Sequence, residues 1–568
     1  MKLTRVRNLL AAFGVTAAAL LGGCVAVATI TADDASGDGD PSKYGLGDYQ
    51  QRYSALSSIN RETVKNLVPV WNLSLDNSAN LSTQPIIVDG VMYISTHNAT
   101  VAIDAMSGRQ KWKRSLDLPA NIGAMICCGQ HARAVAVSDG TVFRGTLDAY
   151  LIAMSAEDGH ILWRTKVADY KQGYSITGAP LVVGDVVITG MAGGEYHTRG
   201  FLRGYDAKTG RLLWTRYTSP SPGESGIETW NGTNGWKTAG GTTWITGSYD
   251  PQLDLVYWGT GNGAPWNPMM RAKGGDSLYI CSVLAIRPRT GEIVWHFQFS
   301  PADPYDYDSV AEMVLADIDV AGQPTKVLMN ANRNGYFYVL DRTNGKLLAA
   351  NQYARKLNWA SGIDMKTGRP IDTEMTQRFK TQEVMRYNEI LWPSIIGAKN
   401  WQPMAFDPRR KLVYINGQNI GATLRNIKQD LKLPAMFFGA DLVGWVEPED
   451  GMRGVMTALD PLTGKKAWEL PMPVPQWAGV LATGGNLIFT GNLFGEFLAY
   501  DSDTGKQLWR FQTGAGITSM PVTWQKDGKQ YVTVLNGAGS LYNAMLADPK
   551  LPAIPPGGSV WTFALHGQ

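Results

Sequence analysis

The stretch GYDAKTGRLLW, residues 204–214, recurs along the chain in modified form and decides the fold. Copies begin at residues 102 (AIDAMSGRQKW), 153 (AMSAEDGHILW), 285 (AIRPRTGEIVW), 458 (ALDPLTGKKAW) and 499 (AYDSDTGKQLW), and a copy at 339 (VLDRTNGKLLA) lacks the Trp. The consensus predicts a strand, a turn closed by Asp or Thr in which Gly takes a positive φ, and a second strand. We expect the Trp to pack between neighbouring units.

Further alternating strands lie between the copies, such as PIIVDGVMYIS from residue 85 and LVVGDVVITG from residue 181. Four short strands in about 40 to 50 residues is the spacing of a propeller blade. Seven copies, and one blade closed by the N-terminal VWNLSL and the C-terminal SVWTFAL, predict an all-β, eight-bladed propeller. We expect it to form a single domain over residues 44–568. The interval between Gly345 and Gly464 must then hold a blade and a long excursion.

Composition excludes several classes of function. The 568 residues include 63 Gly and 19 Trp, which suits a turn-rich β protein, and a net charge of +3 is too small for a nucleic-acid binder. The sequence contains no HExxH, CxxC or CxxCH, so the common zinc motifs and covalent haem attachment are excluded. A metal in this protein would have to use other ligands.

Residues 1–24 resemble a bacterial secretion signal, with Lys2, Arg5 and Arg7 followed by an apolar run and then small residues. Leu-Gly-Gly-Cys at 21–24 resembles a lipobox, which would acylate Cys24 and anchor the protein to a membrane. Ordinary cleavage near residues 26–32 would instead discard Cys24, and the sequence leaves both open. Residues 25–43 include a Gly/Asp-rich linker. We expect the folded part to work in the periplasm, where disulfides persist.

The residues that do not repeat are the candidates for function, since a ligand on the axis of a propeller breaks its symmetry. Cys127 and Cys128 are adjacent, so they form either two buried thiols or a strained vicinal disulfide. Glu195, Asn262, Asp306 and Asp308 carry the oxygen ligands of a hard cation such as calcium, although each by itself is usual for a solvated loop or a turn.

The motifs together resemble the pyrroloquinoline quinone (PQQ) dependent alcohol dehydrogenases of the methanol and ethanol type, from about residue 44 to the C-terminus. The resemblance is carried by the repeats and by Cys127-Cys128, WKTAGGTTW (236–244), SYDPQLDLVYWGTGNGAPWN (248–267), PYDYD (304–308), NRNGYFYVLDRTNGK (332–346), KNWQPMAFDP (399–408) and QWAGVLATGGNLIFTG (476–491). It implies a quinoprotein that oxidises primary alcohols to aldehydes by hydride transfer to metal-bound PQQ.

The resemblance also implies a role for individual residues. Cys127-Cys128 would form a vicinal disulfide against one face of the quinone, with Trp244 stacked on the other. The positions that match contacts to the carboxylates, carbonyls and ring edge of PQQ are Arg133, Thr177, Gly193, Gly194, Thr242, Asn400 and Trp477. Glu195, Asn262 and Asp306 match metal ligands; Glu195 thereby also belongs to the cofactor site. Asp306 would be the general base, and Arg333 the cation beside the quinone oxygens.

Asp308 bears on which metal binds. In the family this position tends to hold Ala, Ser or Thr in calcium-type members and Asp in lanthanide-type members. A trivalent ion of similar radius needs one more anionic oxygen, and residues i and i+2 of an extended segment project to the same side. A lanthanide ion is therefore expected, with Ca²⁺ as the alternative. Asp308 could also simply cap a turn in an acidic loop.

This chain departs from the family at two positions near the expected cofactor. Ser82 stands where members usually carry Glu, and Ala192 where they carry Ser, so that hydrogen bonds to PQQ would be missing or remade. Leu541 stands where methanol-type members place a Trp; it and Trp266 are expected to line the substrate pocket. Cys281 is expected to be a buried strand residue.

Three further expectations concern partners. With no haem motif in the chain, electrons would pass to a separate periplasmic cytochrome c or similar carrier. A lipid anchor and a homodimer are left open. The competing class is a non-catalytic exported propeller, such as the scaffold lipoproteins of outer-membrane assembly that share these repeats, but a scaffold has no need of the residues singled out above.

Overall fold

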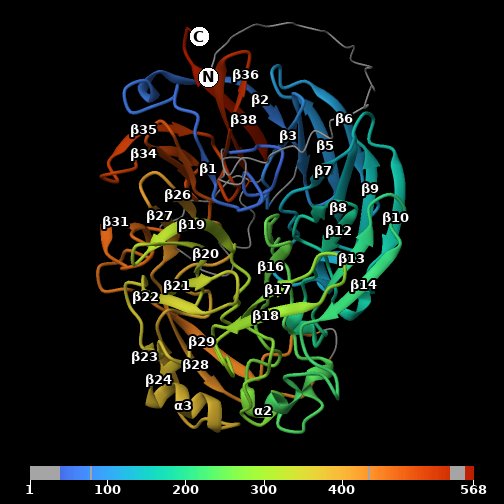
Figure 1. Ribbon diagram of the computed structural model, residues 1–568, viewed down its shortest axis with the longest axis vertical. Helices are drawn as coiled ribbons and strands as arrows, with labels where there is room; N and C mark the ends of the chain where they lie inside the picture. Colours follow the sequence, from blue (N-terminus) through green and yellow to red (C-terminus); the bar gives the residue numbers. More distant parts are fainter. Residues whose placement is uncertain (1–38, 77–79, 433–434, 538–556, 568) are drawn as a thin grey trace, which may run out of the picture.

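The computed structural model describes residues 39–76, 80–432, 435–537 and 557–567. The predicted signal sequence, most of the 25–43 linker and Leu541 lie outside these residues. Within the described part, no helix is long and apolar enough to cross a membrane. Figure 1 shows short sheets arranged around a common centre, with α2 and α3 at the edge of the molecule far from β38. The all-β propeller that the repeats predict is confirmed.

Five four-stranded antiparallel sheets follow one another along the first two thirds of the chain. Their strands are β3 (Ile86–Val88), β4 (Val91–Ser95), β5 (Ala99–Asp104) and β6 (Gln110–Ser115); β7 (Ala136–Ser138), β8 (Thr141–Gly145), β9 (Tyr150–Ser155) and β10 (Ile161–Lys166); β11 (Leu181–Val183), β12 (Val186–Thr189), β13 (Phe201–Asp206) and β14 (Leu212–Tyr217); β15 (Ser248–Asp250), β16 (Leu255–Gly259), β17 (Ser282–Ile286) and β18 (Ile293–Gln298); and β19 (Val314–Val320), β20 (Gln323–Ala331), β21 (Tyr336–Asp341) and β22 (Leu347–Gln352).

Three further sheets of this kind bring the total within the described residues to eight, the number of blades that the repeats predict. They are formed by β26 (Ala405–Asp407), β27 (Leu412–Gln418), β30 (Gly454–Leu459) and β31 (Lys466–Met472); by β32 (Leu481–Thr483), β33 (Leu487–Gly491), β34 (Glu496–Asp501) and β35 (Gln507–Gln512), with β1 (Tyr53–Ser54) added parallel to β32; and by β36 (Val522–Lys526), β37 (Lys529–Asn536), β38 (Ser559–Leu565) and β2 (Leu67–Ser74). In the last sheet β2 pairs with β38, as predicted.

The excursion between residues 353 and 446 is also found. It contains the hairpin β23 (Ala360–Ile363) and β24 (Pro370–Asp372), α3 (Glu374–Thr381), and a small sheet of β25 (Glu389–Leu391), β28 (Gly421–Asn426) and β29 (Ala440–Val446). The remaining helices are α1 (Ile122–Met125), α2 (Pro268–Ala272) and the short 3-10 turns η2 (Val64–Asn66), η3 (Tyr170–Gln172), η4 (Gly194–Tyr196), η5 (Ile227–Trp230) and η6 (Gly235–Lys237).

The repeat turns and their tryptophans join the sheets into a ring. The seven repeat glycines, at 108, 159, 210, 291, 345, 464 and 505, have φ between 68° and 78°, as the turn requires. Each indole Nε1–H donates to a backbone carbonyl of the next sheet at 2.9 to 3.2 Å: Trp71 to Ala105, Trp112 to Ala156, Trp163 to Ala207, Trp214 to Pro288, Trp295 to Arg342, Trp468 to Ser502, and Trp509 to Leu67. The predicted packing of Trp between units is therefore confirmed.

The copy that lacks a Trp makes the same link by other means. In β22 the side chain of Asn351 donates from Nδ2 to the carbonyl of Leu462 at 3.0 Å, and a Cβ on Gly464 would collide with Asn351. With this link each sheet is joined to the next, and the eighth is joined to the first.

The two ends of the ring differ for a topological reason. In every antiparallel four-stranded sheet the first-to-second and third-to-fourth strand turns lie at one end. The repeat turns are third-to-fourth turns, so they occupy that end. The connections between second and third strands, and those between successive sheets, lie at the opposite end, where the residues that do not repeat are brought together.

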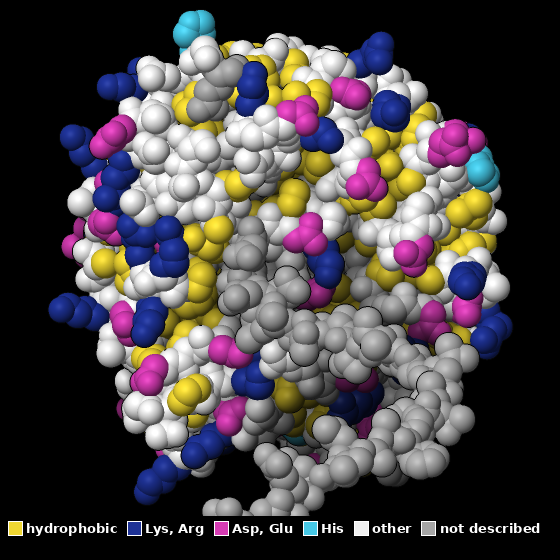
Figure 2. Space-filling view, turned by 45° about the horizontal axis from the view of Figure 1, so that its top comes forward, with side chains coloured by type: hydrophobic (Ala, Val, Ile, Leu, Met, Phe, Trp, Pro, Cys, Tyr) yellow, Lys and Arg dark blue, Asp and Glu magenta, His cyan; other side chains and the backbone are white. Residues whose placement is uncertain are grey.

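On the face shown in Figure 2, basic and acidic side chains are interspersed among apolar ones. This mixture of signs agrees with the small net charge of +3. Cys281 is buried, as expected, but it lies in the turn immediately before β17 and not within the strand.

Candidate functional site

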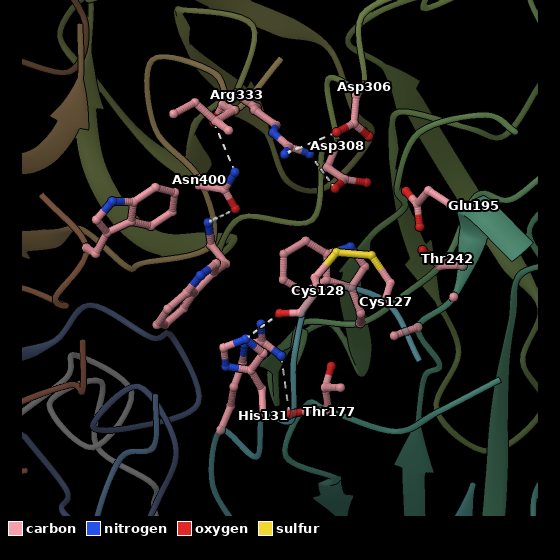
Figure 3. Close-up of a pocket in the computed structure, with 17 residues that line it drawn as sticks. Cys127, Cys128, His131, Thr177, Glu195, Thr242, Asp306, Asp308, Arg333 and Asn400 are labelled. Atoms are coloured by element: carbon pink, nitrogen blue, oxygen red, sulfur yellow. Dashed lines mark hydrogen bonds and ion pairs between the residues drawn. A yellow bond between two sulfur atoms is a disulfide. The ribbon is translucent and has the colours of Figure 1, made fainter. Parts of the chain in front are cut away.

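A cavity at the end of the ring opposite the repeat turns collects most of the predicted site residues (Figure 3). About 770 Å³ of space not filled by protein, open solvent included, lies among its walls. The lining residues are Cys127, Cys128, His131, Arg133, Thr177, Ala192, Gly193, Glu195, Thr242, Trp244, Asp306, Asp308, Arg333, Ile396, Asn400, Trp401 and Trp477. They come from connections between sheets and from two second-to-third strand loops, so distant parts of the chain meet there.

Cys127 and Cys128 form a disulfide that faces the cavity. The structure therefore selects the vicinal disulfide over two free thiols. Cys128 has φ 66°, in the left-handed region that non-glycine residues seldom occupy. A rigid pair of sulfur atoms thus forms one part of the wall.

Aromatic and cationic side chains form another part of the wall. The guanidinium of Arg133 lies 4.8 Å from the ring centre of Trp244 and 5.0 Å from that of Trp401. Contact with two indole faces holds this charge in place by cation–π attraction. An anionic group bound nearby would meet a fixed positive charge.

Three carboxylates and one guanidinium meet at the opposite side of the cavity from His131 (Figure 3). Arg333 donates from Nη1 to Oδ2 of Asp308 at 2.6 Å, and its Nη2 lies 3.4 Å from Oδ2 of Asp306. Oδ1 of Asp308 accepts the backbone N–H of Asn262 at 2.8 Å. Glu195 hydrogen-bonds the side chain of Asn262. The cluster carries more negative than positive charge.

Burial and mutual repulsion disturb all three carboxyl groups. Burial raises the pKa of Glu195, and the charge of Asp308 adds to the shift. Burial also raises the pKa of Asp306 well above its usual range, against the opposing effect of Arg333 and with the help of Asp308. The pKa of Asp308 is raised by burial, although Arg333 opposes the shift. A cation would relieve this excess of buried negative charge.

The donor atoms suit a hard cation. Oδ1 of Asp306 is buried and accepts no hydrogen bond from the described residues, so it has free lone pairs. Asp308 accepts hydrogen bonds from Asn262, Arg333 and the side chain of Trp244, which is fewer than the roughly four lone pairs of a carboxylate. Among the described residues, no three His, Cys, Asp or Glu side chains form a ready coordination shell, so a cation here would need further oxygen donors, such as those of a bound ligand. A carboxylate and amide set of this kind fits Ca²⁺ or a lanthanide ion and not a soft metal.

Two predicted residues do not line the cavity but support residues that do. Asn262 lies behind Asp308 and Glu195, which it contacts as described above. Gly194 begins η4, the turn that carries Glu195. The neighbouring Gly193 has φ 107°, and a Cβ there would collide with the carbonyl of Gly173, so only glycine fits.

Sequence reasoning missed three lining residues, and one residue expected at the substrate pocket is not among those that line this cavity. His131, Ile396 and Trp401 were not selected, although His131 lies between Cys128 and Arg133 and Trp401 follows Asn400. The signal that could have identified His131 and Trp401 is that each lies close in sequence to residues that were selected. Trp266 does not line this cavity: it is buried against Phe438, with ring centres 4.4 Å apart. Its indole packs against the segment of residues 353–446, to which Phe438 belongs.

Thr177 offers a polar atom toward a ligand. Its Oγ1 is buried and makes no hydrogen bond with the described residues. A buried hydroxyl without a partner is costly, so an acceptor or donor on a bound molecule is the expected complement. The polar edge of a quinone cofactor would supply one.

Comparison with known proteins gives one consistent result. The family model described as glucose/ethanol/alcohol dehydrogenase, beta-propeller domain, for PQQ proteins, matches residues 42–353 and 444–532. Quinohemoprotein alcohol dehydrogenase ADH IIB of Pseudomonas putida is 39% identical over an alignment of 570 residues, gaps included. The alignment covers 97% of this chain and 81% of that protein. Quinoprotein alcohol dehydrogenase PedH of P. putida is 40% identical over 549 residues, 92% of this chain and 91% of PedH. A solved europium-containing methanol dehydrogenase aligns with a TM-score of 0.86 at 33% identity, covering 94% of this chain and 99% of that one.

Proposed function

The chain belongs to the PQQ-dependent alcohol dehydrogenases, and from that premise we propose a periplasmic enzyme that oxidises primary alcohols to aldehydes with a lanthanide ion beside PQQ. Alcohol oxidation with PQQ follows from the family. The alcohol class, the metal, the compartment and the electron acceptor form the proposal.

We assign different roles in cofactor binding and proton transfer to the lining residues. When bound, PQQ supplies the electron acceptor and its metal a Lewis acid. The disulfide and Trp244 would contact the faces of the ring system. Arg133, Thr177, Gly193, Gly194, Thr242, Asn400 and Trp477 would hold its polar edge. Asp306 would accept the hydroxyl proton of the alcohol, and Arg333, which forms ion pairs with Asp306 and Asp308, would hold both carboxylates in position.

The observation that carries the choice of metal is the place of Asp308 in the cavity beside Asp306. With Glu195, these residues bring three carboxylates to one site, against the single positive charge of Arg333. The carboxylates of PQQ add negative charge. A trivalent ion balances such a site better than a divalent one, and all the donors are the hard oxygens that both ions prefer. Ca²⁺ is the alternative that the same donors allow.

Reconstitution of the apo-protein tests this proposal. Purified apo-protein is incubated with PQQ and either La³⁺ or Ca²⁺ at matched concentrations, and dye-linked oxidation of a panel of primary alcohols is measured. We expect higher activity with La³⁺. Equal or higher activity with Ca²⁺ would refute lanthanide use, and no activity with either ion would count against the assignment of the cavity as the active site.

The compartment and the acceptor rest on the sequence. The signal-like residues 1–24 support export, and the absence of CxxCH from the sequence supports a separate cytochrome c or similar periplasmic carrier. Osmotic-shock fractionation of cells that produce the chain tests the first point. Reduction of a purified periplasmic cytochrome c by the alcohol-loaded enzyme, followed by its haem absorbance, tests the second.

A further inference from the structure

His131 lines the cavity, although the function proposed above assigns it no role. Its side chain is buried, with 4% of the residue exposed. Its Nε2 lies 2.8 Å from the carbonyl oxygen of Cys128, a member of the vicinal disulfide. Its Nδ1 lies 3.3 Å from the hydroxyl of Ser82. Figure 3 shows the imidazole close to the disulfide, on the side away from the carboxylates.

The two contacts determine the tautomer of the ring. A carbonyl oxygen can only accept, so Nε2 carries the hydrogen and donates it to Cys128. In the neutral ring Nδ1 is then an acceptor, and the hydroxyl of Ser82 donates to it. Burial, together with the charge of Arg133, lowers the pKa of His131 to about 3, so the ring stays neutral at ordinary pH.

Ser82 extends this contact to the place where the ring closes. Ser82 lies between β2 and β3, in the connection from the last sheet to the first. Its hydroxyl lies 3.4 Å from that of Thr518, in the connection from β35 to β36. Ser82 and Thr518 are both fully buried. A row of three polar side chains therefore links the disulfide to the two preceding connections between sheets of the ring.

The disulfide needs such support because its backbone is not in a preferred conformation. Cys128 has φ 66° and the following Gly129 φ 94°, so two successive residues are left-handed. Left-handed backbone is unfavourable for a non-glycine residue, and it persists only where surrounding contacts hold it. The hydrogen bond from His131 holds the carbonyl of Cys128 in that conformation.

We propose that His131 is a positioning residue, which, with its tautomer set by Ser82, fixes the Cys127–Cys128 disulfide as a rigid wall of the cofactor cavity. The proposal depends on the function above only for the identity of the ligand that meets this wall. The proposal also assigns a role to Ser82, which differs from the residue expected at this position. Ser82 contacts the His131 ring and not the disulfide itself, so it would act on the disulfide only through His131.

Reduction of the disulfide in the apo-protein is the test, because it requires neither PQQ nor alcohol. Folded apo-protein is exposed to a phosphine reductant and alkylated at intervals, and the peptide that carries Cys127 and Cys128 is quantified by mass spectrometry. The variants are His131→Leu, which removes the donor, His131→Gln, which keeps an N–H donor, and Ser82→Ala, which removes the group that sets the tautomer. His296→Leu, at an exposed histidine of β18, is the control for a histidine substitution elsewhere.

We expect His131→Leu to speed reduction about tenfold, as loss of a buried hydrogen bond suggests, and Ser82→Ala to speed it by a smaller factor. His131→Gln should restore most of the protection, and the control should match the parent protein. In a second readout, quenching of tryptophan fluorescence by PQQ, the dissociation constant should rise in the same order.

Reduction rates within twofold of the parent for both His131→Leu and Ser82→Ala would overturn the proposal, as would a His131→Gln variant as fast as His131→Leu. If His131→Leu does not fold, the reduction rates of Ser82→Ala and His131→Gln are compared with that of the parent protein. A Ser82→Ala rate within twofold of the parent then overturns the proposal. Failure of metal reconstitution together with a positive reduction result would refute the metal assignment and leave the role of His131 standing.

Discussion

Asp308 occupies a crowded position: one carboxylate oxygen accepts a backbone N–H from Asn262 and the other a guanidinium N–H from Arg333. A residue that only capped a turn would have no need of Arg333, which comes from the loop between β20 and β21. A simple cap of a turn in an acidic loop therefore does not account for all the contacts of Asp308. The same side chain faces the cavity in which Oδ1 of Asp306 accepts no hydrogen bond from the described residues.

Replacement of Asp308 by Ala is expected to reverse the metal preference. The change removes one negative charge and one oxygen donor, which a trivalent ion needs more than a divalent one. The ratio of activity with La³⁺ to activity with Ca²⁺, measured after reconstitution of apo-protein with PQQ, should fall by about tenfold or more. Loss of activity with both ions would instead indicate that Asp308 serves only to hold Arg333.

Replacement of Asp306 by Asn is expected to remove the general base while the shape of the cavity is kept. A positioned acid or base contributes roughly 10²- to 10⁴-fold, so kcat should fall by about a hundredfold or more. PQQ affinity, measured by fluorescence quenching without metal, should stay within a few-fold of the parent value. A kcat that changes less than tenfold would assign the proton transfer to another group.

At the scale of elements, the fold depends on one contact used repeatedly. The repeat tryptophans lie on the outermost strands, donate to the next sheet and cover its turn glycine; a Cβ on Gly291, for example, would collide with Trp214. Because the turn glycine has a positive φ and no side chain, the indole can lie flat against it. Asn351 shows that the hydrogen bond can be kept while the aromatic surface is lost.

Trp214→Ala is expected to destabilise the protein by about 3–5 kcal/mol, the usual cost of removing a buried Trp, since it takes away both the packing on Gly291 and the bond to Pro288. Calorimetry of the thermal unfolding of Trp214→Ala and of the parent protein measures the difference in stability. Trp236→Ala is the matched control, because Trp236 lies in η6 outside the sheets and contacts Arg199 and Lys237. Equal effects of the two substitutions would contradict a special role for the ring contacts.

At the scale of the whole molecule, the ring is closed by strands from both ends of the chain. In the closing sheet β38 lies between β2 and β37, and Val560 and Phe563 of β38 are fully buried. The closing sheet also carries Trp71, which bonds the first sheet, and receives the bond from Trp509 of the seventh. An open ring would expose the edges of β2 and β37 and the walls of the cavity together.

A chain that ends at residue 558 is therefore expected to be insoluble or to lose cooperative unfolding, because it lacks an interior strand. A chain that ends at Leu565 keeps β38 complete and should unfold within about 2 °C of the full chain, as expected for changes at a terminus. Calorimetry of the two truncated proteins, with PQQ binding as a second measurement, tests this. Native-like unfolding without β38 would mean that the ring closes by another pairing.

The sequence by itself determined the elements of this protein and the order in which they occur. The turn of residues 204–214 and its copies are local signals, in which Asp, Thr, Gly and Trp act within eleven residues of one another, so their structure could be predicted without knowledge of the rest. The closing pair β2 and β38, and the excursion after Gly345, followed from counting these copies. The candidate site residues were selected in the same way, as exceptions to the repeat, with the family resemblance supplying their roles.

Only the tertiary structure decided which of these exceptions meet, and what holds them. Arg133 between Trp244 and Trp401, Arg333 on Asp308, and His131 on Ser82 are contacts between different loops of the chain. The same reason explains why Trp266, which the sequence placed at the pocket, packs on Phe438 instead. Local patterns specify turns and strands because their energies are local, whereas the partners of a buried charge or imidazole depend on which loops the closed ring brings to one end.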